Sequence, residues 1–327
     1  MQVGTERVLI TGVFGQDGWY LAQQLAEQGI DVHGTDRHID RVRTRASELP
    51  GVELHHADLV DESAMGELVA DLQPTQIYNL AGSTSVARSW SHPAESAEVL
   101  GVGVVRLLAA AWVLHERGLP VRVLQASSAE IFGDPAESPQ TEDTPHAPIT
   151  PYGAAKAFAH SMVRVYRERG LFAVNAILYN HESPRRPTSF VAAKIAKGVA
   201  DIAAGRASKL KLGNLDVHRD WGFAPDYVDA MRRMLDCARP DDYVVATGDS
   251  RSVRDFVEAA FAVVGIEDWE PYVEIDPTLF RPADPRSLVG DSSRLRHLGW
   301  EPSLTFPELV KAMVQPHLDA SYPVQAN

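Results

Sequence analysis

Short runs rich in β-branched and apolar residues alternate, over the first two-thirds of the chain, with longer segments whose apolar residues recur at helical spacing. The short runs predict buried strands at residues 7–11, 31–35, 52–56, 76–80, 122–126 and 172–178. Between the strands, helical spacing is clearest at residues 20–28, 95–116 and 154–169. Because strand–helix–strand alternation is typical of parallel sheets, we predict an α/β fold built on a doubly wound parallel sheet.

After residue 178 the alternation becomes irregular. Residues 181–188 are rich in proline and arginine and are predicted to form a loop. The pattern then predicts helices at 190–204, 227–239 and 253–264, and strands at 209–212 and 243–246. We therefore expect a sheet domain made of residues 1–180 and about 217–248, and a smaller mixed α/β C-terminal domain made of residues 181–216 and 249–327. The smaller domain is expected to hold the substrate over the carboxyl ends of the strands, where open α/β sheets bind ligands.

Composition narrows the range of partners. The net charge of −13 argues against nucleic acid or an anionic membrane as the main partner. The single cysteine, Cys237, excludes an internal disulfide and indicates a reducing compartment. The sequence shows no leader-peptide pattern and no run that approaches ~20 apolar residues. We therefore expect a cytoplasmic protein without a membrane span.

Three glycines, Gly12, Gly15 and Gly18, follow the first predicted strand at a G-x-x-G-x-x-G spacing. The first permits a tight turn, the second lets the backbone approach a pyrophosphate, and the third allows a helix to pack closely on the strand. The N-terminus of that helix would offer free N–H groups to phosphate. A glycine-rich turn alone would be weak evidence. The strand before it and the helix after it predict Rossmann-type binding of NAD or NADP.

Two neighbouring residues point to different dinucleotides. Asp36 ends the second predicted strand, where a carboxylate accepts hydrogen bonds from the ribose hydroxyls of NAD and repels a 2′-phosphate. Arg37 follows, and a guanidinium there could hold the 2′-phosphate of NADP. Asp58 follows the third strand and is placed to reach the adenine, with a helix N-cap as its alternative role. The choice between NAD and NADP stays open.

Tyr152 and Lys156 stand four residues apart in a predicted helix, so both project from one face. An ammonium near a phenol is expected to lower the tyrosine pKa from its ordinary value of about 10. Such a tyrosine exchanges a proton with a substrate alcohol while a hydride moves to or from the nicotinamide. The pair alone is more typical of an exposed helix face. Its position after the glycine turn favours redox chemistry.

Ser128 and Glu130 follow the fifth predicted strand, at the sheet edge where active groups are exposed. Ser128 can donate a hydrogen bond to the same substrate oxygen as Tyr152. Glu130 suggests a second proton transfer, such as removal of a proton α to a newly made ketone. A loop carboxylate paired with a nearby arginine is the alternative interpretation of Glu130.

Nearly the whole chain resembles the extended short-chain dehydrogenase/reductases, and among them the GDP-mannose 4,6-dehydratases. The similar segments are residues 10–18, 125–133, 138–156, 180–186, 212–216, 219–222, 246–248, 252–254 and 280–284. The most specific of these is residues 180–186, a long loop that general dehydrogenases lack.

The resemblance implies roles for particular residues. Ser128, Glu130, Tyr152 and Lys156 match the catalytic set. The residues expected at the cofactor are Gly12, Phe14, Gly15, Gln16, Asp17, Gly18, Asp36, Arg37, Asp58, Leu59, Leu80, Ala81, Tyr152, Lys156, His181 and Arg186. Those expected at the substrate are Thr84, Glu130, Asn180, Lys194, Leu212, Gly213, Arg219, Arg281 and Asp284. No metal is expected among them.

The implied reaction converts GDP-mannose into a 4-keto-6-deoxy sugar nucleotide. Tyr152 takes the C4 hydroxyl proton as hydride leaves C4, Glu130 takes the C5 proton as the C6 hydroxyl departs, and hydride returns to C6. A related sugar-nucleotide reductase or epimerase is the first alternative, and a non-catalytic dinucleotide sensor is the second. The family also implies a homodimer, with a tetramer as the alternative.

The sequence departs from the family pattern at several positions. Asp36 and His38 stand where the family has basic residues for NADP, and residues 37–52 are shorter than in typical dehydratases. Ser83 and Ser85 replace a glutamine and a histidine near the substrate. Asp284 stands in for a glutamate expected at the nucleotide ribose. These departures bear on the cofactor, the tetramer and the identity of the sugar and base.

Overall fold

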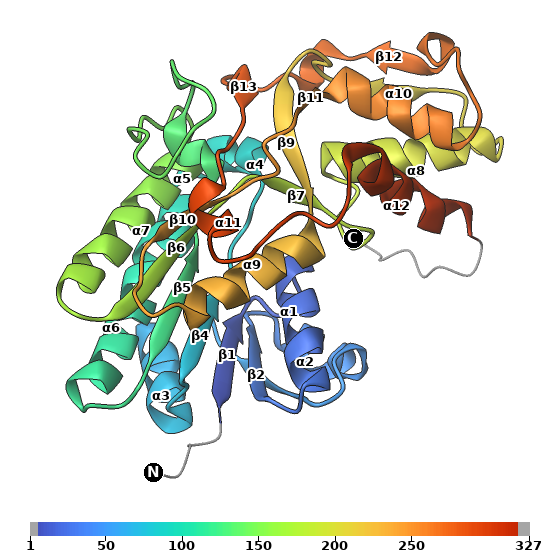
Figure 1. Cartoon of the computed structure of the whole chain (residues 1–327). Coiled ribbons are helices and arrows are strands. Elements are labelled where there is room, and N and C mark those ends of the chain that lie inside the picture. Colours follow the sequence, from blue (N-terminus) through green and yellow to red (C-terminus); the bar gives the residue numbers. More distant parts are fainter. Residues whose placement is uncertain (1–5, 320–327) are drawn as a thin grey trace.

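The computed structural model describes residues 6–319 and is built on a seven-stranded sheet (Figure 1). Every neighbouring pair of strands in it is parallel. In the order β3-β2-β1-β4-β5-β6-β10, the strands are Val52–His56, Asp31–Asp36, Arg7–Thr11, Gln76–Asn79, Arg122–Ala126, Phe172–Leu178 and Asp242–Val245. The strand order reverses between β1 and β4, so the predicted doubly wound fold is confirmed. A crevice therefore opens at the carboxyl ends of these two strands.

Helices cover both faces of this sheet. On one face α1 (Gln16–Glu27) and α9 (Ala224–Asp236) share an apolar core with β1 and β6. On the other face lie α3 (Glu62–Leu72), α6 (Gly103–Glu116) and α7 (Pro151–Glu168). Shorter elements complete the domain: α2 Ile39–Thr44, a 3-10 turn Ala46–Glu48, α4 Val86–Ser91, α5 Pro93–Ala97, a π turn Glu98–Val102, the 3-10 turn η3 Ala129–Phe132 and α11 Ser293–Arg296.

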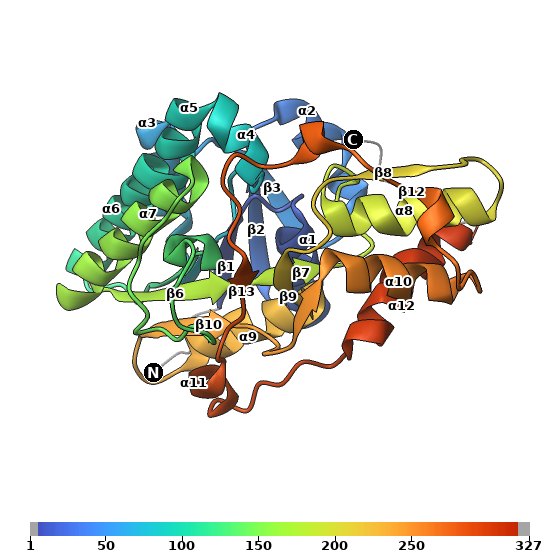
Figure 2. The ribbon, with the colours of Figure 1, turned by 90° about the horizontal axis from the view of Figure 1, so that it is seen from above.

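The smaller domain has a core of its own, formed mainly by α8 (Val191–Ala203), α10 (Val253–Val263) and α12 (Phe306–Leu318). Its strands are β7 Asn180–Glu182, β8 Leu210–Leu212, β9 His218–Phe223, β11 Ser250–Ser252, β12 Val273–Ile275 and β13 Ser287–Leu288, with 3-10 turns at Glu270–Tyr272 and Pro277–Leu279. The first half of β9 pairs with β11 and β13, and its second half pairs with β7. Figure 2 shows β7 and β9 between the large sheet and the three helices.

The chain passes between the domains several times. After β9 it returns to the large sheet through α9 and β10, but β9 itself belongs to the smaller sheet. Farther on, Leu295 and Trp300 pack in the core beside α9, so part of the 249–327 segment lies with the sheet domain. The loop expected from residue 181 is wrong at its start, because His181 and Glu182 pair with β9. The high proline and arginine content therefore predicts a loop correctly only for the residues after Glu182.

The helical stretch Pro93–Glu116 is 24 residues long and apolar enough, by length and composition, to cross a membrane. The expectation that no such stretch exists is therefore wrong on those two measures. The same composition is typical of a core helix, and Leu107, Leu108 and Ala111 of this stretch are buried in the core that α3 and α7 share. Arg106, in the same stretch, forms an ion pair with Glu98 at 2.6 Å.

A buried polar network ties α7 to the sheet beneath the crevice. The His160 ring contacts the Ser127 hydroxyl at 3.0 Å and the Asp242 carboxylate at 3.2 Å. Asp242 also accepts hydrogen bonds from Arg167 and, at 2.9 Å, from Asn175. Burial opposes the ionisation of Asp242, but His160 and Arg167 outweigh it and hold the Asp242 pKa well below its ordinary value. The network therefore depends on one charged carboxylate.

We expect Asp242→Ala to lower the free energy of unfolding by about 3–5 kcal/mol, because it leaves buried partners without their counter-charge. Asp241→Ala, next to it but half exposed, should cost less than about 1 kcal/mol. Chemical denaturation near neutral pH measures both. Since the folded-state pKa of Asp242 is depressed, this stabilisation is present above the ordinary carboxyl pKa and is lost as the pH falls below it. Equal losses in the two variants would contradict this account.

Candidate active site

The glycine turn lies between the ends of β1, β2 and β4, with no room for a side chain at Gly12 or Gly18. Gly12 has a φ of +71°, and a Cβ built on it would lie 2.8 Å from the Cα of Ala81. The N–H groups of Gly12 and Val13 both donate to the carbonyl of Thr35. A Cβ on Gly18 would lie 2.4 Å from the carbonyl oxygen of Gly12. These contacts leave a cradle of bare backbone at the start of α1, whose first N–H groups lack partners within the helix. Such a cradle fits a dinucleotide pyrophosphate.

The end of β2 carries the residues predicted to choose the dinucleotide. Asp36 is mostly buried, and its carboxylate accepts a hydrogen bond from the N–H of His38 at 2.8 Å. Arg37 is more exposed and lies 3.8 Å from Glu95. Asp58 accepts from the N–H of Val60. The N-cap of α3 is Asp61, so the alternative cap role for Asp58 is wrong, while Leu59 is buried.

The first two turns of α7 carry the tyrosine and the lysine. Thr150 caps this helix by accepting from the N–H of Gly153 at 2.9 Å, and Pro151 occupies its first position. A Cβ on Gly153 would lie 2.5 Å from the carbonyl oxygen of Glu130. The missing side chain therefore lets α7 pack directly on η3, and this packing brings Tyr152 to Ser128 and Glu130.

Burial has the largest effect on the pKa values of Tyr152 and Lys156. Burial raises the pKa of Tyr152 to about 12, although a hydrogen bond with Ser128 opposes the rise. The Lys156 ammonium donates to the carbonyl of Ala126 at 2.7 Å, and burial lowers its pKa to about 8. Its nitrogen lies 5.8 Å from the centre of the Tyr152 ring. The expected lowering of the tyrosine pKa by Lys156 is therefore wrong here, because desolvation of the phenolate is the larger effect.

Glu130 is the carboxylate of the site. Its Oε2 is buried and has no hydrogen-bond partner within residues 6–319. Burial raises the Glu130 pKa, and the charges of Arg219 and Arg281 oppose the rise. Within the described part of the chain no ion pair neutralises it, which disfavours the alternative interpretation. A buried carboxylate of raised pKa is a stronger base than an exposed one and suits proton abstraction.

Positive side chains from several elements gather in the same cavity. Arg219 on β9 forms an ion pair with Asp284, which also lies 3.3 Å from Arg281. Lys194 on α8 and Asn180 on β7 line the same space. This local positive charge, on a protein of net charge −13, suits a diphosphate.

A second set of contacts joins the glycine turn to the segment after β6. The His181 ring contacts the Asp17 carboxylate at 2.9 Å and the Tyr179 carbonyl at 2.8 Å. Gln16 donates to the carbonyl of His181 and accepts from the hydroxyl of Ser183. Burial opposes both charges, yet the pair raises the His181 pKa and, with help from Arg186, lowers the Asp17 pKa. This ion pair holds the smaller domain against α1.

One cavity of about 390 Å³ brings most of the predicted residues together. Those that line it are Asp17, Leu80, Ala81, Thr84, Ser128, Glu130, Tyr152, Lys156, Asn180, His181, Arg186, Lys194, Leu212, Gly213, Arg219, Arg281 and Asp284. The others, Gly12, Phe14, Gly15, Gln16, Gly18, Asp36, Arg37, Asp58 and Leu59, lie along the glycine turn or at the ends of β2 and β3.

Sequence reasoning missed the apolar and small walls of this cavity. Val86, Phe190, Trp221 and Phe280 line it, and so does Asn214. Phe280 and Asn214 stand inside segments that resemble the family, so proximity to Arg281 and Gly213 could have identified them. Val86 and Phe190 carry no chemical signal of their own. Only the packing of α4 and α8 around the crevice places them there.

Comparison with known proteins points to one family. The family model described as GDP-mannose 4,6 dehydratase matches residues 9–313. GDP-mannose 4,6 dehydratase 2 of Arabidopsis thaliana is 43% identical over 324 residues, covering 95% of this chain and 86% of the relative. The chain belongs to the GDP-mannose 4,6-dehydratase family. The human GDP-mannose 4,6 dehydratase is 41% identical, over 94% of this chain and 90% of the relative. The Vibrio cholerae enzyme is 39% identical, over 95% and 93%.

Solved structures extend the likeness to the whole fold of this dehydratase-family chain. RMD from Pseudomonas aeruginosa, complexed with NADPH, has a TM-score of 0.77 at 26% identity and covers 96% of this chain and 98% of its own. The Thermus thermophilus UDP-glucose 4-epimerase, complexed with NAD, has a TM-score of 0.82 at 26% identity, over 96% and 99%. Relatives of this fold thus hold either dinucleotide.

We expect Gly18→Ala to weaken binding of the dinucleotide about 10-fold or more, because the new methyl group displaces the backbone of Gly12 from the cradle. Gly66→Ala is the control, since a Cβ there meets nothing within 4 Å. Calorimetric titration of each variant with NAD⁺ and NADP⁺ measures the effect. Wild-type affinity in Gly18→Ala would show that the turn does not form the cradle.

Proposed function

We propose that this protein removes water from GDP-mannose and releases GDP-4-keto-6-deoxymannose. The observation that carries this proposal is the placement of Glu130. The buried Oε2 of this side chain has no hydrogen-bond partner within residues 6–319, and Glu130 shares one cavity with Tyr152 and Lys156. A simple alcohol dehydrogenase needs the hydroxyl groups and the lysine but no such base. The family to which the chain belongs points to the same reaction.

Tyr152, Ser128 and Lys156 have different roles in the oxidation of C4. Tyr152 takes the proton of the C4 hydroxyl as that carbon becomes a ketone, and Ser128 holds the same oxygen by a hydrogen bond. Lys156, whose nitrogen lies 5.8 Å from the centre of the Tyr152 ring, supplies a positive charge beside that tyrosine, but desolvation of the phenolate remains the larger effect on the Tyr152 pKa. A nicotinamide dinucleotide held by the glycine cradle would supply the hydride acceptor for C4 and the hydride donor for C6, with no net change in its redox state.

Glu130 carries the elimination. The new C4 ketone makes the C5 proton acidic, and the Glu130 carboxylate takes that proton. The raised pKa of Glu130 lets the resulting carboxylic acid pass a proton to the C6 hydroxyl, which leaves as water. The C5–C6 double bond that forms is then reduced at C6. Glu130, reprotonated from solvent, protonates C5, and Tyr152 releases to solvent the proton that it took from the C4 hydroxyl. The net reaction converts GDP-mannose into GDP-4-keto-6-deoxymannose and one molecule of water.

The cations opposite the catalytic groups hold the rest of the substrate. Arg219, Arg281 and Lys194 surround the space for the diphosphate, and Asp284 accepts hydrogen bonds from both arginines. Asp284 therefore orients the two guanidinium groups, a role beyond the ribose contact inferred from the resemblance. A reductase or epimerase would use Tyr152 and Lys156 without Glu130, so Glu130 favours the dehydratase. An intact Tyr–Lys pair disfavours a sensor.

An exposed apolar surface on α6 and α7 supports a homodimer. Val102 and Val113 lie along one helical stretch, Phe158 and Val165 lie along the other, and all four are exposed. Burial of this surface against a second copy would remove it from water. The free thiol of Cys237 suits the reducing cytoplasm, which we propose as the compartment.

We expect Glu130→Gln to bind the dinucleotide normally but to lose the elimination, with kcat reduced about 100-fold or more. The amide cannot accept the C5 proton, whereas the glycine cradle is untouched. Mass spectrometry of the sugar nucleotide, which is lighter by one water in the product, measures turnover. Glu137→Gln, an exposed carboxylate farther along the same segment, is the control and should retain full activity.

The pH profile gives a second readout of Glu130. Because burial raises its pKa, the wild-type rate should fall as the pH drops through a value above that of an exposed glutamate, which is about 4.3. Full activity of Glu130→Gln would show that another group is the base. Stoichiometric oxidation of NADPH or NADH without loss of water would instead support a reductase.

The carboxylate of Asp36 leads us to propose NAD as the preferred dinucleotide. A mostly buried carboxylate at the end of β2 repels a 2′-phosphate, and Arg37 beside it is exposed and paired with Glu95. We expect Asp36→Asn, which keeps an acceptor for the His38 N–H, to shift the ratio of the NADP to NAD affinities by about tenfold toward NADP. Asp40→Asn, exposed on α2, is the control. A wild type that already prefers NADP would contradict the proposal.

A further inference from the structure

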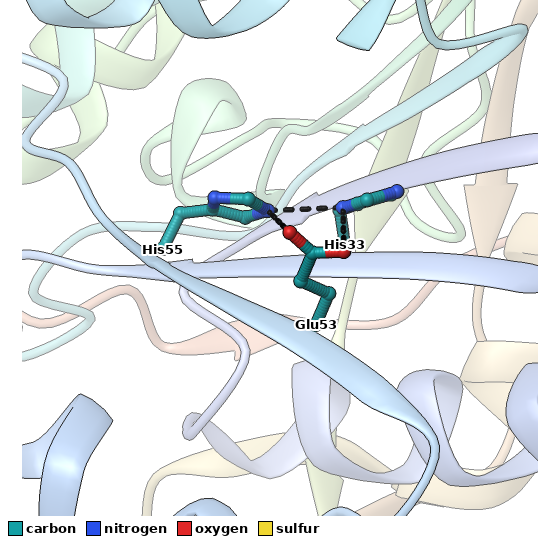
Figure 3. A group of neighbouring side chains, drawn as sticks. All are labelled: His33, Glu53 and His55. Atoms are coloured by element: carbon teal, nitrogen blue, oxygen red, sulfur yellow. Dashed lines mark hydrogen bonds and ion pairs between the residues drawn. The ribbon is translucent and has the colours of Figure 1, made fainter.

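Three side chains that take no part in the proposed reaction meet on the edge of the cofactor-binding sheet. His33 lies on β2, and Glu53 and His55 lie on the edge strand β3. The parallel register pairs His33 with Glu53 and Thr35 with His55, so the three side chains lie on the same face. Figure 3 shows them pointing toward one another from the two strands. None of the three lines the catalytic cavity.

The distances between their ligand atoms suit a single metal ion. His33 Nδ1 and His55 Nε2 are 2.9 Å apart, and each lies 3.8 Å from an oxygen of Glu53. A tetrahedral ion with bonds of 2.0–2.1 Å holds its ligand atoms about 3.3 Å apart. The observed separations are smaller and larger than that value, so small rotations of the exposed Glu53 side chain and the partly buried His55 side chain complete the geometry.

The carboxylate of Asp31 lies beside the ring nitrogen of His33 that faces away from His55 and Glu53. The other ring nitrogen of His33, Nε2, lies 3.2 Å from Asp31, which Arg7 holds at 2.7 Å. Nε2 makes no aligned hydrogen bond within residues 6–319, but the negative charge of Asp31 at this distance favours a proton on Nε2 and so leaves the lone pair of Nδ1 directed at His55 and Glu53. Ligating histidines in metal sites commonly have such a partner on their second nitrogen.

A hydrogen bond between the two rings is the competing explanation, and it accounts for less. One proton between His33 and His55 satisfies one contact and leaves Glu53 beyond hydrogen-bonding distance of both rings, at 3.8 Å. One cation satisfies both lone pairs and the carboxylate together. We propose that His33, Glu53 and His55 form a site for a divalent transition-metal ion of the zinc class, outside the catalytic cavity.

The ligand set and its exposure define the kind of ion. Two imidazoles select zinc, nickel or copper over magnesium or calcium, which prefer oxygen ligands. The His33 side chain is 5% exposed, that of His55 is 20% exposed and that of Glu53 is 68% exposed. The ion would therefore be held by the buried His33 and would be accessible to water on the side of Glu53. The ion would join the edge strand β3 to β2. The strand β2 ends at Asp36, and Asp58 follows the end of β3.

The test is equilibrium dialysis of the full-length protein against Zn²⁺ after treatment with a chelator, with the bound metal counted per chain. The wild type should bind one more ion than His55→Ala and Glu53→Gln. His56→Ala is the matched control, because it lies next in β3 with its side chain on the opposite face, and it should bind as the wild type does. Asp31→Asn should weaken binding about 10- to 100-fold.

Thermal unfolding keeps the result separate from misfolding. Zn²⁺ should raise the melting temperature of the wild type and of His56→Ala, and should not raise that of His55→Ala or Glu53→Gln, because only a folded site binds the ion. Equal zinc stoichiometry in the wild type and His55→Ala, or no zinc bound by the wild type, would overturn the proposal.

Discussion

The contact between the first turn of α7 and the 3-10 turn after β5 fixes the catalytic geometry. Gly153 lies against the carbonyl of Glu130, where any Cβ would be 2.5 Å from that oxygen. This contact places Tyr152 and Lys156, the proposed redox pair, beside Glu130, the proposed base. Capping by Thr150 and the buried His160–Asp242 network hold the two elements in this position. The backbone packing thus joins two proton-transfer groups in one cavity.

The cavity is locally positive although the protein as a whole is negative. The protein carries a net charge of −13, yet the cavity collects arginines and a lysine where a diphosphate would lie. The Arg219–Asp284 pair and the His181–Asp17 pair both connect elements that are far apart in the sequence. The smaller domain is therefore attached through the same residues that form the site, so folding and substrate binding share their contacts.

Much of this site could be predicted from the sequence, and the rest could not for physical reasons. The strands and the glycine turn follow from local patterns, since each depends on neighbouring residues. The small strands β7, β11 and β13 have three residues or fewer and carry no periodicity. The raised pKa of Tyr152 and the meeting of His33 with His55 depend on burial and strand pairing between distant segments, which the sequence pattern does not reveal.

The most direct test of an internal redox cycle is a tracer experiment with GDP-mannose that carries deuterium at C4. The account predicts that the deuterium appears at C6 of the 4-keto-6-deoxy product, because hydride leaves C4 and returns to C6 of the same sugar. It also predicts that one hydrogen from solvent appears at C5, where Glu130 exchanges its proton. Product that forms without deuterium at C6, as it would if the returning hydride came from an outside pool, would contradict the account.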